Sequence, residues 1–257
     1  MGMPAGLSAD DVTLHVTADP AGAGAGAAHV AADVIRDAIA ARGSARIVLA
    51  AAPSQQEMLA ALVRDASIDW SRVHAFHMDE YVGLPQTHPQ AFGQWLQERL
   101  SVAGLGSFTR LRPEADPVTE AVRYATLLAQ GPIDLTCMGI GVNGHIAFNE
   151  PDVARFDDPA AVRVVELDPV SRQQQVDEGL FARLEDVPAQ AVTLTVPTLL
   201  SANSIVVTVH GRHKAAALRL ALTGPIGPAC PASALRTHRS VSVHADAAAA
   251  SGLDELT

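Results

Sequence analysis

A histidine and a glutamate lie five residues apart in the segment MGIGVNGHIAFNEP, which runs from Met138 to Pro151. His145 can gain and lose a proton near neutral pH, and Glu150 can orient it or stabilise its charged form. A tight turn with an ordinary solvated His and Glu is the alternative. The mixture of polar and apolar residues in HIAFNEP follows neither a strand period nor a helix period, which favours a functional loop.

A second segment, FHMDEYVGLP from Phe76 to Pro85, contains two adjacent carboxylates after an apolar run. Neighbouring side chains of an extended chain point to opposite sides, so Asp79 and Glu80 should have different roles. Alone, this segment is equally consistent with a solvated acidic turn. Together the two segments predict a proton-transfer site of Asp79, His145 and Glu150 that needs no metal and no nucleophilic Ser or Cys.

Regular elements must position these segments, and apolar runs alternate along the chain with helical periods. Strands are expected at residues 46–50, 73–77, 133–138, 162–167, 191–196 and 204–209, and helices at 27–41, 54–64, from about 89, at 120–128 and at 214–222. Ser54 and Glu57 match a capping box at the start of the second helix. The Ala/Gly-rich stretch before residue 27 is expected to be loosely ordered at the extreme end. The alternation predicts an α/β fold with a mostly parallel sheet, whose strand ends carry both candidate segments.

Composition limits the class of protein. The 257 residues, 48% of them hydrophobic, fit a single domain (1–257) with a well-buried core. A net charge of −10 without clusters of Lys and Arg argues against a nucleic-acid-binding face or an anionic membrane surface. No membrane span and no signal peptide is recognisable, so a cytoplasmic location is expected. Cys137 and Cys230 are expected as free thiols, and no zinc spacing occurs, so neither a metal nor a cofactor is predicted.

Over most of its length the chain resembles the glucosamine-6-phosphate deaminase/6-phosphogluconolactonase family. FHMDEYVGLP and GIGVNGHIAFNEP carry the resemblance, with weaker support from VPAQAVTLTVPTLL, HGRHKAAAL and PASAL. MDEY together with GHIAFNEP looks like the deaminase branch. The resemblance implies a Rossmann-like three-layer α/β/α fold of the ribose-5-phosphate isomerase/deaminase type. It also implies a deaminating aldose–ketose isomerisation, in which glucosamine 6-phosphate yields fructose 6-phosphate and ammonia.

By position, the resemblance makes Asp79 the base that moves a proton between C2 and C1 of the open-chain sugar. His145 would act in opening the sugar ring, with Glu150 holding and charging it. Many deaminases have Asp at the position of Asn143. An amide can orient His145 by hydrogen bonding, but it does not stabilise a charged imidazolium as a carboxylate does.

The same motifs place Glu80, Tyr81 and Gly144 at the substrate. Gly144 and Gly141 would let the backbone approach the sugar closely.

The phosphate end of the predicted site departs from the family pattern. AAPSQ replaces a TGGTP-type loop, although Ser54 and Gln55 still lie at a helix N-terminus, where free N–H groups favour an anion. A simple capping role for Ser54 has similar weight. Lys214 matches the family's phosphate lysine, whereas DEGLF at residues 177–181 lacks the family's arginine. Arg172 is a candidate second donor, or equally a partner in a surface salt bridge.

The first hypothesis is therefore a deaminase-like hydrolase or isomerase that acts on a phosphorylated amino sugar. A sugar-phosphate lactonase or isomerase on the same fold is the second reading, and a non-catalytic sugar-phosphate sensor is the third. The complete set of proton-transfer residues argues against the sensor. A homo-oligomer is left open, and allosteric activation is not predicted.

Overall fold

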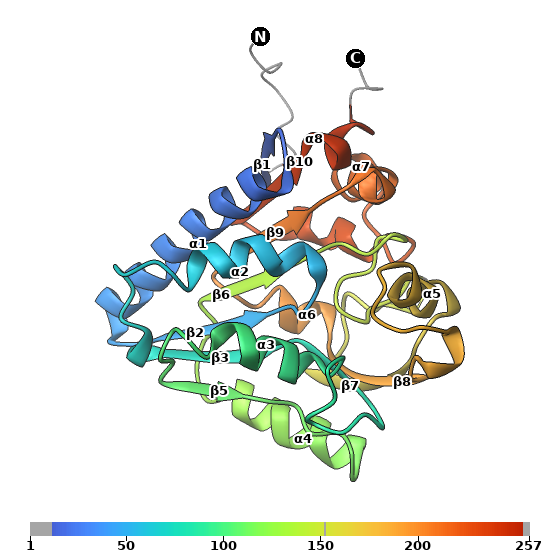
Figure 1. Ribbon diagram of the computed structural model, residues 1–257, viewed down its shortest axis with the longest axis horizontal. Coiled ribbons are helices and arrows are strands. Elements are labelled where there is room, and N and C mark those ends of the chain that lie inside the picture. The colour runs from blue at the N-terminus through green and yellow to red at the C-terminus, as the bar shows by residue number, and fades with distance from the viewer. Residues whose placement is uncertain (1–11, 152, 254–257) are drawn as a thin grey trace.

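The computed structural model describes residues 12–151 and 153–253. Within this part of the chain, seven parallel strands form the central sheet (Figure 1). In spatial order they are β1 (Val12–Thr17), β10 (Val241–Asp246), β9 (Ser204–Val209), β6 (Leu135–Met138), β2 (Ala45–Leu49), β3 (Val73–His77) and β5 (Ser107–Thr109). The predicted parallel sheet is confirmed, and four of the expected strands lie in it within two residues of their predicted bounds.

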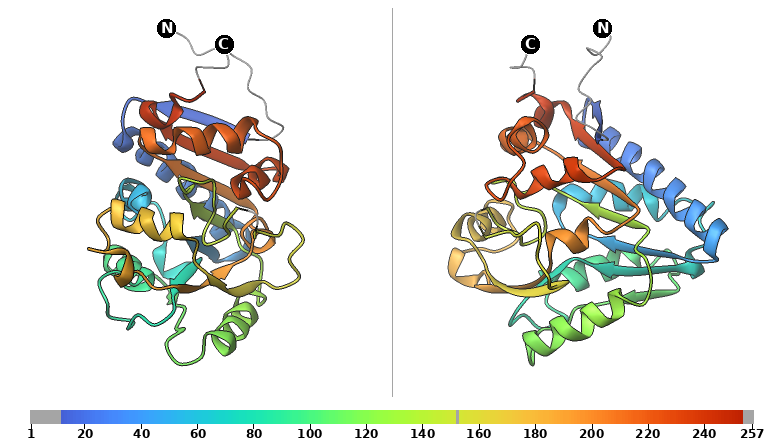
Figure 2. Two further views of the ribbon diagram at one scale, coloured as in Figure 1. Left: turned by 90° about the vertical axis from the view of Figure 1, so that its right-hand side faces the viewer. Right: turned by 180° about the vertical axis from the view of Figure 1, so that it is seen from behind.

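Helices cover both faces of this sheet, as the expected three-layer fold requires. One apolar core joins the strands to α1 (Pro20–Arg42), α2 (Gln56–Leu62) and α3 (Phe92–Leu100). A second core, on the other face, joins them to α4 (Pro117–Leu128), α6 (Val196–Leu199), α7 (Ala215–Thr223) and α8 (Ala247–Ala250). Figure 1 views the sheet from the side of α1 and α2, and the rear view in Figure 2 shows α4 and α7. In the described ranges no helix is long and apolar enough to cross a membrane.

A smaller antiparallel sheet lies beside the main one. It consists of β4 (Asp79–Tyr81), β8 (Gln190–Leu194) and β7 (Val162–Glu166), and α5 (Pro169–Asp177) connects β7 to β8. The strands predicted at 162–167 and 191–196 therefore exist, but they pair antiparallel outside the main sheet. Met78 joins the two sheets, because its N–H bonds to Leu49 O (3.3 Å) and its carbonyl accepts the N–H of Leu194 (2.8 Å).

The expectation of a loosely ordered extreme end concerns residues that the structure does not describe, whereas the chain from residue 12 onward forms β1 and the start of α1. β1 pairs with β10, and α1 already begins at Pro20, where the Asp19 side chain accepts the N–H of Gly22 (2.8 Å). One of the glycines in this stretch serves close packing: a Cβ on Gly24 would lie 2.5 Å from the Cβ of Glu57 in α2. Residues 1–11 lie outside the described residues.

The capping box predicted at Ser54 is wrong. Ser54 lies inside a 3-10 turn, Pro53–Gln55, and α2 begins at Gln56 with no side-chain cap. The 3-10 turn places Ser54 within helical backbone, so its hydroxyl does not reach an N-cap position. Other 3-10 turns lie at Trp70–Arg72, Leu184–Asp186, Arg212–Lys214 and Pro231–Thr237.

Candidate active site

A cavity of about 1090 Å³ opens where the carboxyl ends of β2, β3, β6 and β9 meet. Its walls come from the loops after these strands and from α5. Asp79, His145, Ser54 and Lys214 all line it. The structure thus brings together residues from four predicted segments at the edge of a parallel sheet where α/β proteins bind ligands.

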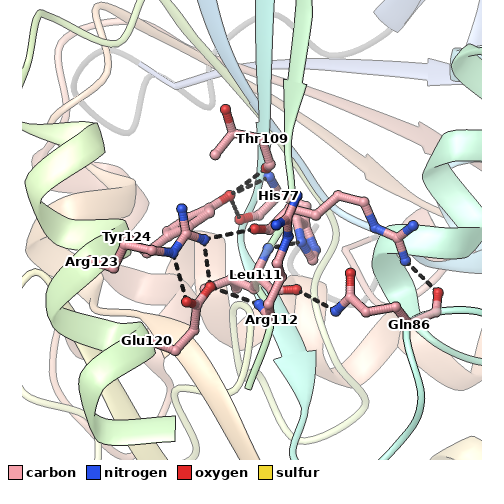
Figure 3. Close-up of polar contacts among 9 residues, drawn as sticks. His77, Gln86, Thr109, Leu111, Arg112, Glu120, Arg123 and Tyr124 are labelled. Atoms are coloured by element: carbon pink, nitrogen blue, oxygen red, sulfur yellow. Dashed lines mark hydrogen bonds and ion pairs between the residues drawn. The ribbon is translucent and has the colours of Figure 1, made fainter. Parts of the chain in front are cut away.

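Asp79 follows a rigid strand end (Figure 3). The Tyr124 hydroxyl from α4 accepts the N–H of His77 (2.9 Å) and donates to its carbonyl (2.8 Å). The N–H of Leu111 donates to Nε2 of His77 (2.8 Å), which requires an unprotonated Nε2. Burial, together with the nearby Arg110, lowers the pKa of His77 to about 3, so the ring stays neutral. This network fixes the backbone two residues before Asp79.

Asp79 and its neighbour Glu80 point to opposite sides, as expected for extended chain. Asp79 is 6% exposed and lines the cavity. Glu80 instead accepts the backbone N–H groups of Tyr81 (3.0 Å), Phe92 (3.0 Å) and Gly93 (2.8 Å), and so fixes β4 to the start of α3. Burial, aided by the charge of Glu80, raises the pKa of Asp79 well above its usual range. Burial also raises the pKa of Glu80, to about 7, against the effect of its hydrogen bonds.

The hydrogen bonds of Asn143 determine which nitrogen of His145 carries the proton. Asn143 Oδ1 accepts the backbone N–H of His145 (3.1 Å), and its Nδ2 donates to Glu150 Oε2 (2.9 Å). The amide is therefore oriented with Oδ1 toward the ring, 2.8 Å from His145 Nδ1. Because Oδ1 only accepts, we assign neutral His145 the tautomer with its proton on Nδ1. Nε2 then keeps a lone pair for proton transfer.

Glu150 lies buried behind this ring, with Oε2 3.4 Å from His145 Nδ1. Burial raises the pKa of Glu150, but hydrogen bonds from His145, Ser171 and Asn143 outweigh that effect and bring the pKa below its ordinary value. The carboxylate is therefore ionised at neutral pH. It can stabilise a proton that His145 gains.

The loop between β6 and Glu150 contains positions where a Cβ would clash or where φ is positive, and most residue types are unfavourable there. A Cβ on Gly141 would lie 2.2 Å from Cε1 of His145 and so overlap the ring. A Cβ on Gly144, which has a φ of 87°, would lie 2.7 Å from Cys230 Sγ. Ala147 has a φ of 48°, a left-handed conformation that costs a residue with a Cβ about 1 kcal/mol. Strain of this kind concentrates at functional sites, where the surrounding structure holds it.

Lys214 lies at the other end of the cavity, 6% exposed, in the 3-10 turn before α7. Its Nζ is 3.6 Å from Oε1 of Glu178, which also accepts a hydrogen bond from Gln174 (2.7 Å). Burial lowers the pKa of Lys214, and Glu178 opposes that change. Ser54 also lines the cavity. The buried side chain of the next residue, Gln55, donates to Thr208 Oγ1 (2.5 Å) and so holds this loop against β9.

Several predicted substrate-binding residues are not brought to the cavity wall. Glu80 holds α3, and Tyr81 packs in a separate aromatic cluster with Phe92 and Phe148. Gln55 anchors its loop, and Gly144 packs against Cys230. Arg172 Nη2 donates to the carbonyls of Leu184 and Val187 (both 2.8 Å), which gives its guanidinium a structural role in place of an anion contact. None of these five residues lines the cavity, whereas the other two predicted substrate-binding residues, Ser54 and Lys214, do.

The sequence reasoning missed Ser171 of α5 and Glu178, which directly follows that helix. Ser171 Oγ lies 2.9 Å from His145 Nδ1, and Glu178 pairs with Lys214. A helix start at Asp168 and Pro169 was the available signal, because Asp before Pro is a favoured N-cap and first-turn pair. Across residues 12–151 and 153–253, no group of three or more His, Cys, Asp or Glu side chains is arranged to hold a metal ion.

A parallel sheet between helices, with acid and base side chains in a cavity at its strand ends, places the chain among the α/β proteins that have a ligand site at this edge of the sheet. The chain belongs to the family described as glucosamine-6-phosphate isomerases/6-phosphogluconolactonase, whose model matches residues 18–244. The resemblance inferred from the two motifs is thereby confirmed.

Individual members of the family show more closely which proteins the chain is similar to. A glucosamine-6-phosphate deaminase of Streptococcus pneumoniae is 35% identical over 228 residues, which cover 88% of this chain and 94% of the relative. The structure of a monomeric glucosamine-6-phosphate deaminase matches with a TM-score of 0.85 and 28% identity, over 93% of this chain and 99% of that one. A 6-phosphogluconolactonase from Shewanella baltica matches with a TM-score of 0.75 and 19% identity, over 92% of this chain and 97% of that one, and shows the fold alone.

Proposed function

We propose that the chain is an enzyme that converts glucosamine 6-phosphate and water to fructose 6-phosphate and ammonia. One observation carries this proposal: Asp79 and the hydrogen-bonded pair of His145 and Glu150 line or support a single cavity. Two separate proton-transfer groups suit a reaction that opens a sugar ring and then moves a proton between two carbons. The identity to a deaminase agrees with this chemistry.

In the first step, His145 Nε2 takes the proton of the O1 hydroxyl and passes it to the ring oxygen O5 as the C1–O5 bond breaks. His145 is therefore positively charged only during the step and is neutral at its end. The positive charge on the imidazole is balanced by ionised Glu150, 3.4 Å from Nδ1. Asn143 holds the ring in the tautomer that this step requires.

In the second step, Asp79 removes the proton from C2 of the open-chain aldehyde and delivers it to C1. Its raised pKa makes the ionised carboxylate a stronger base and its protonated form an adequate carrier. Loss of the C2 proton, with transfer of a proton from the C2 ammonium group to O1, gives an enolamine. Return of the proton from Asp79 to C1 gives an iminium at C2. Water adds there, and the nitrogen leaves as ammonium ion while the C2 carbonyl forms. The reaction is thus an isomerising deamination. For lactone hydrolysis, the alternative reading, the 6-phosphogluconolactonase of Shewanella baltica at 19% identity supports the fold alone.

The phosphate is proposed to bind at Lys214 and Ser54, which both line the cavity. Lys214 supplies a buried positive charge, and Ser54 a hydroxyl donor. Glu178, which pairs with Lys214 at 3.6 Å, then has to give way to the phosphate.

The direct test is to incubate purified protein with glucosamine 6-phosphate and to measure ammonia and fructose 6-phosphate. Equal amounts of both are expected, and Asp79→Asn should abolish turnover while substrate binding persists. Asp37→Asn on the exposed face of α1 is the matched control and should retain full activity. Absence of both products with the wild type would refute the proposed function, and near-full turnover by Asp79→Asn would remove Asp79 from the base role.

A further inference from the structure

The Nδ1 atom of His145 faces oxygens from two separate parts of the chain. Asn143 Oδ1 (2.8 Å) and Glu150 Oε2 (3.4 Å) belong to the loop of His145 itself. The third oxygen, Ser171 Oγ at 2.9 Å, comes from α5. Ser171 is fully buried, so water does not compete for its hydroxyl.

The hydroxyl of Ser171 can serve both partners of the pair. The Nδ1 proton assigned above is a donor, so Ser171 Oγ accepts a share of it and keeps its own proton free. Ser171 is also one of the groups whose hydrogen bonding lowers the pKa of Glu150, together with His145 and Asn143. His145 is the titratable group in contact with Glu150, while Asn143 and Ser171 are its neutral neighbours.

We propose that Ser171 is a positioning residue, which holds His145 and Glu150 in register for ring opening and so makes α5 part of the reacting apparatus. This inference rests on the proposed function for its kinetic consequence. It extends that function because it assigns a role to a residue outside both sequence motifs.

Helix α5 fixes the hydroxyl by two contacts with the same loop. Ser171 and Gln174 are three residues apart and therefore share a helix face. Gln174 Oε1 accepts the N–H of Val142 (3.1 Å), next to the Asn143 that orients the ring. The helix is thus docked on the loop on both sides of Asn143, and the Ser171 rotamer is held by buried surroundings.

The Ser171 hydroxyl matters more because residue 143 is an asparagine and not an aspartate. A carboxylate at residue 143 would add a second negative charge beside Nδ1, whereas an amide does not. Glu150 is then the carboxylate in contact with the ring, and a neutral donor that keeps it ionised supports the imidazolium indirectly.

The test compares Ser171→Ala with Ser171→Thr, which retains the hydroxyl. The matched control is Ser101→Ala, at an exposed serine that directly follows α3. We expect Ser171→Ala to lower kcat about tenfold with KM changed less than about twofold. The acidic limb of the kcat/KM profile should move to higher pH, and Ser171→Thr should restore most of both.

A second readout does not depend on activity. In protein with ¹³C-labelled glutamate, the Glu150 signal, assigned by its loss in Glu150→Gln, should titrate at higher pH in Ser171→Ala than in the wild type. An unchanged Glu150 titration overturns the proposal, even if kcat falls, because the serine would then be merely structural. If the wild type releases no ammonia, the proposed function fails, while the Glu150 titration still decides the role of Ser171.

Discussion

Asp79 and His145 are held in place by different means, and the difference sets what each can do. Asp79 is positioned by backbone, since the end of β3 is clamped by Tyr124, and its basicity comes from burial beside Glu80. His145 is positioned by its side-chain contacts, with Asn143 and Ser171 both within 2.9 Å of Nδ1. Changes near His145 should therefore affect the reaction more directly than they affect the fold.

Gly141 gives a prediction at this scale. A Cβ there would overlap the His145 ring, so Gly141→Ala must push the imidazole away from Asn143 and Ser171. We expect kcat for ammonia release to fall at least about tenfold, because a displacement near 1 Å at a reacting group costs that much or more. Steady-state kinetics on glucosamine 6-phosphate measures the effect.

Gly227→Ala is the matched control, because a Cβ there meets no atom within 4 Å and the φ of Gly227 is not in the left-handed region. Its kinetics should equal those of the wild type. Wild-type kcat in Gly141→Ala would mean that the loop absorbs the Cβ without moving the ring, and the tight packing seen here would not matter for turnover.

At the scale of elements, α5 spans the cavity from one end to the other. Ser171 contacts the His145 loop near its start, and Glu178, just after its last residue, pairs with Lys214. Gln174, between them, bonds to both Val142 N and Glu178. The helix thus connects the loop of His145 with Lys214, the proposed phosphate ligand, although it belongs to neither sequence motif.

The pair of Lys214 and Glu178 predicts opposite effects of two substitutions. Lys214→Met removes the buried cation and should raise KM for glucosamine 6-phosphate about tenfold or more, with a smaller change in kcat. Glu178→Gln removes the carboxylate that competes with phosphate for Lys214, so KM should fall. Steady-state kinetics at fixed ionic strength separates the two effects. A higher KM in Glu178→Gln would show that Glu178 assists binding and does not compete for Lys214.

At the scale of the whole molecule, the strands that could be predicted from the sequence are those with a clear run of apolar residues. The strand at 204–209 was found with its observed bounds because SIVVTV is mostly apolar and β-branched, in a sheet buried on two faces. β1 and β10 were missed because apolar and polar residues alternate in VTLHVT and VSVHAD, so neither is a continuous apolar run; the exposed His15 stacks on the buried His244.

Helix α5 was missed for a related reason. Its buried residues are Ser171, Gln174 and Gln175, so its inner face is polar and shows no hydrophobic period. A helix that lines a polar cavity has to bury polar side chains, and hydropathy does not reveal it. The two strand-end motifs were found because their residue types are unusual, whereas the contacts of Glu80 and Arg172 depend on partners far away in sequence.

Two buried histidines and one buried glutamate change the free energy of unfolding with pH in opposite directions. Burial, with nearby positive charge, lowers the pKa of His77 to about 3, and burial beside His15 lowers that of His244 to about 4. Between these values and about 6.5 the unfolded chain binds more protons at these rings, so they make stability rise with pH. Glu80 acts in the other direction. Its pKa is raised from 4.5 to about 7, so the folded chain holds the extra proton between those values and stability falls as pH rises.

Glu80→Gln isolates this second contribution, because it removes the titrating carboxyl while an amide oxygen remains to accept N–H groups at the start of α3. Between pH 4.5 and 7, the free energy of unfolding should rise with pH more steeply in the variant than in the wild type, by up to about 1.4 kcal/mol per pH unit. Urea denaturation at pH 5, 6 and 7 measures both slopes, and Glu98→Gln on the exposed face of α3 should follow the wild type. Parallel curves for Glu80→Gln and wild type would mean that Glu80 is already ionised in the folded protein at pH 5, and its charge would then act on Asp79 throughout the neutral range.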